Sequence, residues 1–280
     1  GKIIEVITSS VRLLLHLSQE KYDVVTSIAG LSLCYAAHLK RIPSVTFTDD
    51  PEYNLSYSLY SRFSKQLISP RYCKISGKNK FSYDGYKELA HLHPNNFKPS
   101  KRILEVYNLE PNNFVLIREQ APISLVYRDA RIGQLYGVAK KIKELGFKVI
   151  LSLEDKSEAE IYKDIGIILK EPVDSFHSLI YYAKFVVSSG DSLSREAALL
   201  GTPSIYTGGR KMSINKELIE MGLIFKEEDY GKIALVSEFL ACTDFKSSVS
   251  KKLDNKFQKD WIDTSKMITE RLISMSNNNY

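Results

Sequence analysis

The sequence predicts an α/β protein in which two Rossmann-like domains face a cleft. Short apolar segments rich in β-branched residues alternate with amphipathic helical segments along most of the 280 residues. A polar, proline-bearing stretch at 71–100, with a short helix near 84–91, separates two such blocks and is interpreted as the end of the first domain and a linker. We therefore divide the chain into an N-terminal domain over 1–108 and a C-terminal domain over 109–280.

The N-terminal block has the order helix, strand, helix, strand. Because a helix connects its first two strands, these strands are expected to be parallel. The chain opens at Gly1 with a helix, whereas an α/β domain normally opens with a strand, so we expect this domain to lack its first strand. The predicted elements of this block are helices over 2–20 and 30–40 and strands over 23–27, 43–48 and 66–70.

The C-terminal block alternates strands and helices more regularly. Asp174 is a candidate N-cap, and Gly146, Gly201 and Gly222 are predicted to end helices. The predicted strands are 113–118, 148–153, 166–170, 184–189 and 202–207. The predicted helices are 101–107, 131–145, 174–183, 191–200, 214–222, 231–240 and 247–275.

The composition excludes several classes of protein. Lys plus Arg exceeds Asp plus Glu by 39 − 33 = 6, a mild excess that suits phosphate-bearing ligands or an anionic membrane surface and requires neither. No basic run interleaved with aromatic residues indicates a nucleic-acid groove. The three cysteines form no CxxC pair, which argues against a zinc site or a disulfide framework. Without a signal peptide or a long apolar run, the sequence predicts a cytoplasmic protein.

Residues 186–209 carry the most informative pattern in the chain. A predicted strand ends there in small residues, and a predicted helix starts immediately after them. The N–H groups and positive dipole of a helix start favour a phosphate, and small residues let a ligand approach the backbone. The same pattern also fits an ordinary capped strand–helix unit with a glutamate at its surface. The candidate ligand-binding residues of this segment are Ser189, Gly190, Asp191, Ser192 and Glu196.

An acidic cluster follows the predicted strand at 43–48 and consists of Asp49, Asp50 and Glu52. A carboxylate at the carboxyl end of a strand is a candidate general base that activates an acceptor hydroxyl. The alternative is a polar loop or a helix cap. Asp50 is the favoured candidate because Pro51 biases it towards extended backbone, which would prolong the strand and direct the carboxylate towards the cleft.

Arg118 ends the predicted strand at 113–118 and is a candidate for neutralising a phosphate, with a structural ion pair as the alternative. No GxGxxG follows a strand and no GxxxxGK[ST] occurs, so the fingerprints of nicotinamide-type and P-loop sites are missing. The run from Gly190 to Ser194 is similar to a nucleophile elbow, but Ser194 stands where that motif has its closing glycine. A serine hydrolase is therefore disfavoured.

The run small-small-Gly-x-x-x-x-Arg-Glu-Ala-Ala-Leu-Leu-Gly-Thr-Pro at 188–203 resembles a known family. That family is prokaryotic, largely archaeal and of unknown function, and it belongs to the GT-B glycosyltransferase clan alongside UDP-N-acetylglucosamine 2-epimerases. The resemblance covers nearly the whole chain and implies a GT-B-like fold. It also implies that a segment holding the first strand of the N-terminal domain is absent here. The other matching stretches are Ile42–Asp50, Tyr83–Ala90, Phe97–Pro99 and Leu116–Arg118.

The resemblance also implies roles for residues of the 186–209 segment. Relatives in the clan bind a nucleotide diphosphate at the helix start and a ribose with the second glutamate of a Glu-Glu-Ala triplet. The matching residues here are Gly190, Asp191, Ser192 and Glu196. The family usually has a run of glycines at the helix start, and this chain departs from it with a single glycine. Asp191 then brings negative charge close to the expected diphosphate, unless its side chain caps the helix.

The resulting expectation is a metal-independent GT-B-like glycosyltransferase that uses a nucleotide sugar, UDP-linked, as substrate and needs no cofactor. Its acceptor would be an unidentified glycan or lipid. A non-hydrolysing UDP-sugar 2-epimerase is the alternative enzyme, although such epimerases carry His-x-Glu-Ala-Gly where this chain has Thr48–Glu52. A non-catalytic nucleotide-sugar-binding or scaffold protein is the alternative from another class, and the unusual Asp191 favours it.

Overall fold

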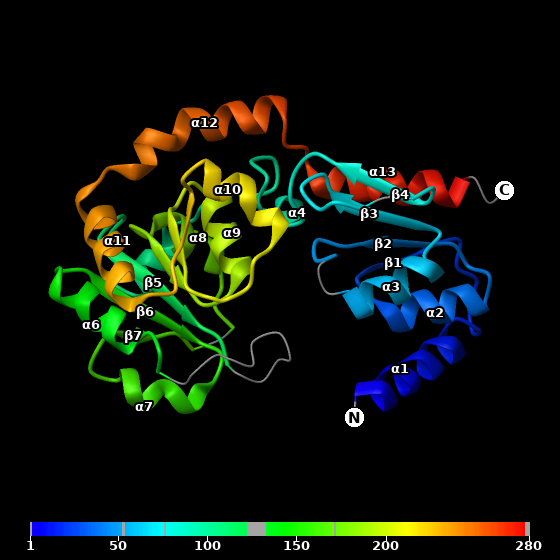
Figure 1. Ribbon diagram of the computed structural model, residues 1–280, viewed down its shortest axis with the longest axis horizontal. Helices are drawn as coiled ribbons and strands as arrows, with labels where there is room; N and C mark the ends of the chain where they lie inside the picture. Colours follow the sequence, from blue (N-terminus) through cyan, green and yellow to red (C-terminus); the bar gives the residue numbers. More distant parts are fainter. Residues whose placement is uncertain (1, 52–53, 76, 122–132, 171, 278–280) are drawn as a thin grey trace. The chain divides into compact units, whose positions relative to one another are not determined.

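A computed structural model describes residues 2–51, 54–75, 77–121, 133–170 and 172–277. The chain forms two compact units (Figure 1). The first unit comprises Gly1–Asn95, Met212–Ile214 and Asp260–Tyr280, and the second comprises Asn96–Lys211 and Asn215–Lys259. This division differs from a boundary at 108, because the second unit starts earlier and the end of the chain returns to the first.

The first unit contains a parallel sheet with the strand order β1-β2-β3-β4. Its strands are β1 Val25–Ile28, β2 Ser44–Phe47, β3 Gln66–Pro70 and β4 Lys80–Tyr83. Its helices are α1 Lys2–His16, α2 Leu31–Leu39, α3 Asn54–Phe63, α4 Leu89–Leu92 and α13 Thr264–Asn277. The predicted parallel pairing of the first two strands is confirmed. The stretch 71–100 is interpreted from the sequence as the end of the first domain and a linker. The linker part of this interpretation is wrong for most of the stretch, since β4 and α4 lie within it and β4 pairs with β3, while the first unit runs to Asn95.

Helix α13 covers part of this first sheet although it follows the whole second unit in the sequence (Figure 1). Met275 is buried in one apolar cluster with Val45 and Phe47 of β2 and Ile68 of β3. Met267, Ile268 and Leu272 of the same helix pack against that cluster. The fold of the first unit therefore depends on residues from both ends of the sequence.

The second unit contains a parallel sheet with the order β10-β9-β8-β5-β6-β7. Its strands are β5 Phe114–Glu119, β6 Lys148–Leu153, β7 Ile167–Ile168, β8 Val186–Ser188, β9 Ser204–Tyr206 and β10 Ile224–Lys226. Its α-helices are α5 Arg102–Val106, α6 Tyr136–Glu144, α7 Ala159–Tyr162, α8 Phe176–Tyr182, α9 Asp191–Leu199, α10 Lys216–Glu220, α11 Tyr230–Cys242 and α12 Phe245–Lys259. The predicted α/β class with parallel sheets is confirmed.

Strand β5 shows how this second sheet is buried on both faces. Val115 and Ile117 belong to a core cluster shared with α6 and α11, whereas Phe114 and Leu116 belong to a second cluster shared with α5, α8 and α9. Alternate residues of a strand point to opposite faces, so both faces require apolar side chains. This double burial makes β5 a rigid support for the residues that follow its carboxyl end.

Several predicted elements need correction. The helix predicted over 247–275 is two helices, because the chain leaves helical geometry between Lys259 and Thr264. Asp174 is not the N-cap of α8, since Ser175 occupies that position with a left-handed φ of 58° and makes no side-chain capping hydrogen bond. Across the described residues, no helix combines the length and apolar character needed to cross a membrane.

Candidate functional site

The candidate site lies at the carboxyl edge of the second sheet, where β5 and β8 end side by side. Arg118 of β5 is in register with Ser188 of β8. Gly190 follows β8 and leads directly into α9. In a parallel α/β sheet this edge is where ligands bind, since the loops and helix starts that follow the strands gather there.

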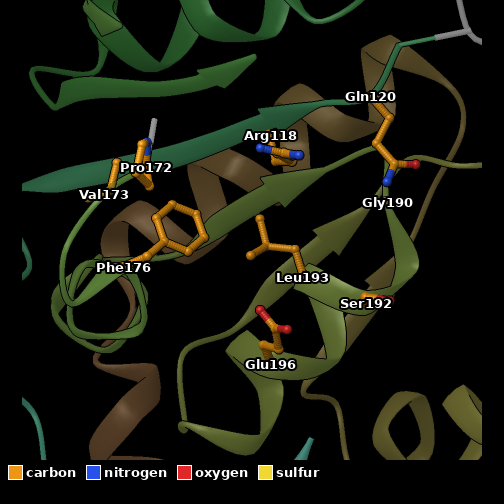
Figure 2. A pocket seen from close by; sticks show the side chains of 9 residues that line it. All are labelled: Arg118, Gln120, Pro172, Val173, Phe176, Gly190, Ser192, Leu193 and Glu196. Carbon is orange, nitrogen blue, oxygen red and sulfur yellow. The ribbon is translucent and has the colours of Figure 1, made fainter. Parts of the chain in front are cut away.

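A cavity of about 500 Å³ opens at this edge, and all the residues that line it belong to the second unit. Figure 2 shows apolar side chains gathered at one end and the helix start with Gln120 at the other. A pocket of mixed character suits a ligand with an apolar ring at one end and polar groups at the other. The lining residues are Arg118, Gln120, Pro172, Val173, Phe176, Gly190, Ser192, Leu193 and Glu196.

Gly190 packs closely against the side chain of Gln120, which would have to shift to accommodate any other residue at position 190. A Cβ atom there would lie only 2.7 Å from Nε2 and 2.8 Å from Cδ of Gln120. The Oγ of Ser188 accepts from the N–H of Gly190 at 3.0 Å and donates to its carbonyl at 2.8 Å, which fixes the turn between β8 and α9. Gly190 is the N-cap of α9, so no capping side chain occupies the helix start.

Ser189 ties the ends of the two strands together. Its Oγ accepts a hydrogen bond from the backbone N–H of Gln120 at 2.8 Å, and the residue is buried. The structure thus places Ser189 behind the cavity, where it holds Gln120 in position, and not among the lining residues.

Asp191 is also outside the lining, because its carboxylate is buried in an ion pair. Its Oδ2 lies 2.7 Å from Nη1 of Arg195, one turn along α9, and both side chains are nearly inaccessible. Its Oδ1 lies 3.7 Å from Nη1 of Arg210, in the loop after β9. Arg195 also donates to Oδ1 of Asn215 at 3.1 Å. Asp191 therefore neither caps α9 nor reaches the cavity, and its charge is held by arginines.

Glu196 and Arg118 line the cavity from two different elements. Glu196 lies on α9, and its Oε2 is 3.4 Å from Nε2 of His177 on α8. Arg118 donates from Nη1 to Oγ of Ser152 at 2.6 Å, a contact between neighbouring strands that holds the guanidinium at the sheet edge. The cavity thus brings together a carboxylate, a guanidinium and a helix start, which can bind hydroxyls and a phosphate.

The acidic cluster of the first unit is only partly described, since Glu52 lies outside the described residues. Asp49 is buried and forms an ion pair with Nζ of Lys87 at 2.7 Å. Its backbone carbonyl accepts from the thiol of Cys73 at 3.3 Å. Asp49 is therefore held on both its side chain and its backbone, which is typical of a structural residue.

Asp50 does not prolong β2, because the strand ends at Phe47 and the chain bends at Asp49. The extended geometry expected from the following proline thus does not continue the strand. The backbone N–H of Asp50 donates to Oγ1 of Thr48 at 3.4 Å, and Thr48 in turn contacts the hydroxyl of Tyr60 at 2.8 Å. Burial raises the pKa of Tyr60 to about 12, and the charge of Asp50 adds to the rise.

A buried acidic group that the sequence analysis missed lies on the other face of β5. Glu119 is fully buried, accepts from the N–H of Gln134 at 2.8 Å and from the hydroxyl of Tyr162, and has a pKa raised by burial. Burial and the charge of Glu119 raise the pKa of Glu158 to about 7. The contacts of Glu119 connect β5 to the segment before α6 and to α7, which indicates a structural role.

Of the lining residues, Arg118, Gly190, Ser192 and Glu196 were predicted from the sequence. Gln120 could have been found from its position two residues after Arg118, at the same strand end. The apolar lining residues carry no such signal, because in the sequence they look like core positions of a loop and two helices. They are Pro172, Val173, Phe176 and Leu193.

Comparison with solved structures supports the fold. The chain is similar to S. aureus MnaA bound to UDP, with a TM-score of 0.68 and 13% identity over 100% of this chain and 83% of that one. It is also similar to a UDP-GlcNAc 2-epimerase of Methanocaldococcus jannaschii in complex with UDP-GlcNAc and UDP. The TM-score is 0.65 and the identity is 15%, over 85% of this chain and 74% of that one. The glycotransferase of kitacinnamycin has a TM-score of 0.61 and 9% identity, over 96% of this chain and 81% of that one. These likenesses establish a GT-B-like fold with two Rossmann-like units.

Sequence comparison gives the family. The uncharacterized protein MJ0665 of Methanocaldococcus jannaschii is 23% identical over 229 residues, which cover 78% of this chain and 67% of that protein. The model of the family described as "Protein of unknown function (DUF354)" matches residues 1–275. The chain therefore belongs to the DUF354 family.

Proposed function

We propose that the cavity of the second unit binds a nucleotide sugar and that the protein transfers the sugar to a glycan or lipid acceptor without a metal. The observation that carries the proposal is the meeting of the α9 start, Arg118 and Glu196 in one cavity of nucleotide size. The similar solved structures that bind UDP or UDP-GlcNAc support the same ligand class.

Each part of such a ligand has a complementary surface in this cavity. A phosphate is favoured by the dipole of α9 at Gly190 and Ser192 and by the guanidinium of Arg118. Hydroxyls of a ribose can donate to the carboxylate of Glu196. A nucleobase can pack against the ring of Phe176 at the apolar end (Figure 2).

A non-hydrolysing UDP-sugar 2-epimerase is the second candidate, favoured by the similarity to solved 2-epimerases. Incubation with UDP-GlcNAc separates the two activities. An epimerase gives the 2-epimer without any acceptor, detected by the anomeric proton in NMR. A transferase gives free UDP only when an acceptor from a glycan or lipid extract is present. Binding without either product would indicate a non-catalytic binding protein.

UDP at a concentration 100 times its Kd is expected to raise the melting temperature by about 5–10 °C, since binding to the native state contributes about 2.7 kcal/mol. Differential scanning calorimetry with UDP, a UDP-sugar and inorganic phosphate measures the shift. Inorganic phosphate is the control, because it has neither base nor ribose and should shift the temperature much less. If millimolar nucleoside diphosphates leave the melting temperature unchanged, the proposed ligand is wrong.

Glu196→Ala is expected to weaken UDP binding by about 1–3 kcal/mol, roughly 5- to 150-fold, because hydrogen bonds to a charged group are lost. Isothermal titration calorimetry measures the Kd. Glu220→Ala on α10 is the matched control, since that side chain is exposed and outside the cavity lining. Wild-type affinity in a folded Glu196→Ala variant would assign Glu196 to the structure alone.

A further inference from the structure

The start of α9 carries a fixed negative charge beside the cavity. Asp191 stands between Gly190 and Ser192, both of which line the cavity, while its own carboxylate is buried. The 2.7 Å contact with Arg195 and the 3.7 Å contact with Arg210 hold the carboxylate in one place. A ligand phosphate at this helix start would thus lie close to a carboxylate that cannot turn away.

The charge of Asp191 also acts on a neighbouring tyrosine, Tyr206. Burial is the main cause that raises the pKa of Tyr206 to about 12, the charge of Asp191 adds to it, and Arg210 and Arg195 oppose it. The carboxylate also neutralises positive charge that these two arginines would otherwise present at the helix start. The potential in the cavity is therefore less positive than the dipole of α9 and the arginines alone would make it.

Sugar transfer changes the charge of the nucleotide. In the reaction, the glycosidic C–O bond to the β-phosphate breaks, a C–O bond to the acceptor oxygen forms, and the proton of the acceptor hydroxyl passes through a general base to solvent. The nucleotide sugar, with two negative charges on its diphosphate diester, thereby becomes UDP, with about three at neutral pH. A fixed negative charge repels the product more strongly than the substrate.

We propose that Asp191 is a specificity-determining residue that weakens the binding of the free nucleoside diphosphate relative to the nucleotide sugar and so favours product release. This inference rests on the proposed function. It gives a functional role to Asp191, the one charged residue among the small residues at the start of α9. It requires no contact between Asp191 and the ligand. Repulsion through a short stretch of protein is sufficient, because the residues on both sides of Asp191 line the cavity.

The test compares the Kd values of UDP and UDP-GlcNAc in the wild-type protein and in Asp191→Asn, measured by calorimetry. Asparagine can still accept from Arg195 but carries no charge. The affinity for UDP is expected to rise about 3- to 10-fold more than that for UDP-GlcNAc. Asp244→Asn is the matched control, because it removes the same charge from an exposed residue outside the cavity lining. It should leave the ratio of the Kd of UDP to the Kd of UDP-GlcNAc unchanged.

Arg210→Gln provides an independent variant if Asp191→Asn does not fold, since Arg210 is partly exposed and belongs to the same charge cluster. It is expected to shift the ratio in the opposite direction, against UDP. If the Kd values of UDP and UDP-GlcNAc change by the same factor in these variants, or do not change, the role of Asp191 is overturned while the proposed function stays intact. If neither ligand binds to any of these folded proteins, the proposed function fails and this inference fails with it.

Discussion

Replacing Asp50 with asparagine is expected to lower turnover roughly 10²- to 10⁴-fold and to leave the affinity for the nucleotide nearly unchanged. This is the contribution of a general base, which asparagine cannot replace because it does not accept a proton. Within the acidic cluster, Asp49 is the less suitable base, because its carboxylate is buried in an ion pair with Lys87. Asp50 belongs to the first unit and the nucleotide cavity to the second, so nucleotide affinity should not depend on it.

Turnover is measured as the release of UDP in the presence of acceptor extracts, or as formation of the 2-epimer of UDP-GlcNAc. Asp84→Asn is the matched control in the same unit, because Asp84 is partly exposed and pairs with Arg71 at the surface. The control should retain wild-type turnover. Full activity in the Asp50→Asn protein would remove Asp50 from the reaction.

Arg195→Ala is expected to destabilise the second unit by about 3–5 kcal/mol. The substitution removes the closer of the two arginines that face the buried carboxylate of Asp191, and breaking a buried ion pair by removing one partner is costly. It also empties the space of the largest fully buried side chain among the described residues. The double variant Asp191→Asn/Arg195→Met should lose less stability than Arg195→Ala, because it removes both charges and fills most of the volume of the arginine.

Urea unfolding followed by circular dichroism measures this loss. The single tryptophan of the chain, Trp261, is buried in the first unit, so its fluorescence reports that unit separately and should change little. Arg102→Ala on α5 is the control, since Arg102 is exposed and its loss should cost less than about 0.5 kcal/mol. Wild-type unfolding of Arg195→Ala would show that the ion pair contributes nothing net.

Most of the fold could be predicted from the sequence because its strands are short segments rich in apolar and β-branched residues that alternate with helical segments. Strands β3 and β6 begin and end at the predicted residues. Strand β4 was missed because it lies at the edge of the sheet and only Tyr83 of its residues is buried, so its pattern is mostly polar. The break between α12 and α13 was missed because it depends on tertiary packing, with Trp261 buried against Tyr86.

The candidate site could be predicted only where it follows directly from strand ends. Arg118 and Gly190 end or follow parallel strands, and such positions converge on one edge. The apolar wall could not be predicted, because Phe176 and Leu193 have the same periodicity as core residues. The burial of Asp191 could not be predicted, since one of its two arginine partners, Arg210, comes from a loop after another strand.

The return of α13 to the first sheet has a consequence for how the chain folds on the ribosome. Synthesis delivers the strands of the first unit first, but the helix that covers part of their sheet last. The residues of the second unit end at Lys259, before α13, so that unit can fold in between. Until α13 is synthesised, the apolar cluster around Val45 and Ile68 lacks the Met275 side chain that packs into it. The nascent first unit therefore exposes an apolar surface to which chaperones can bind.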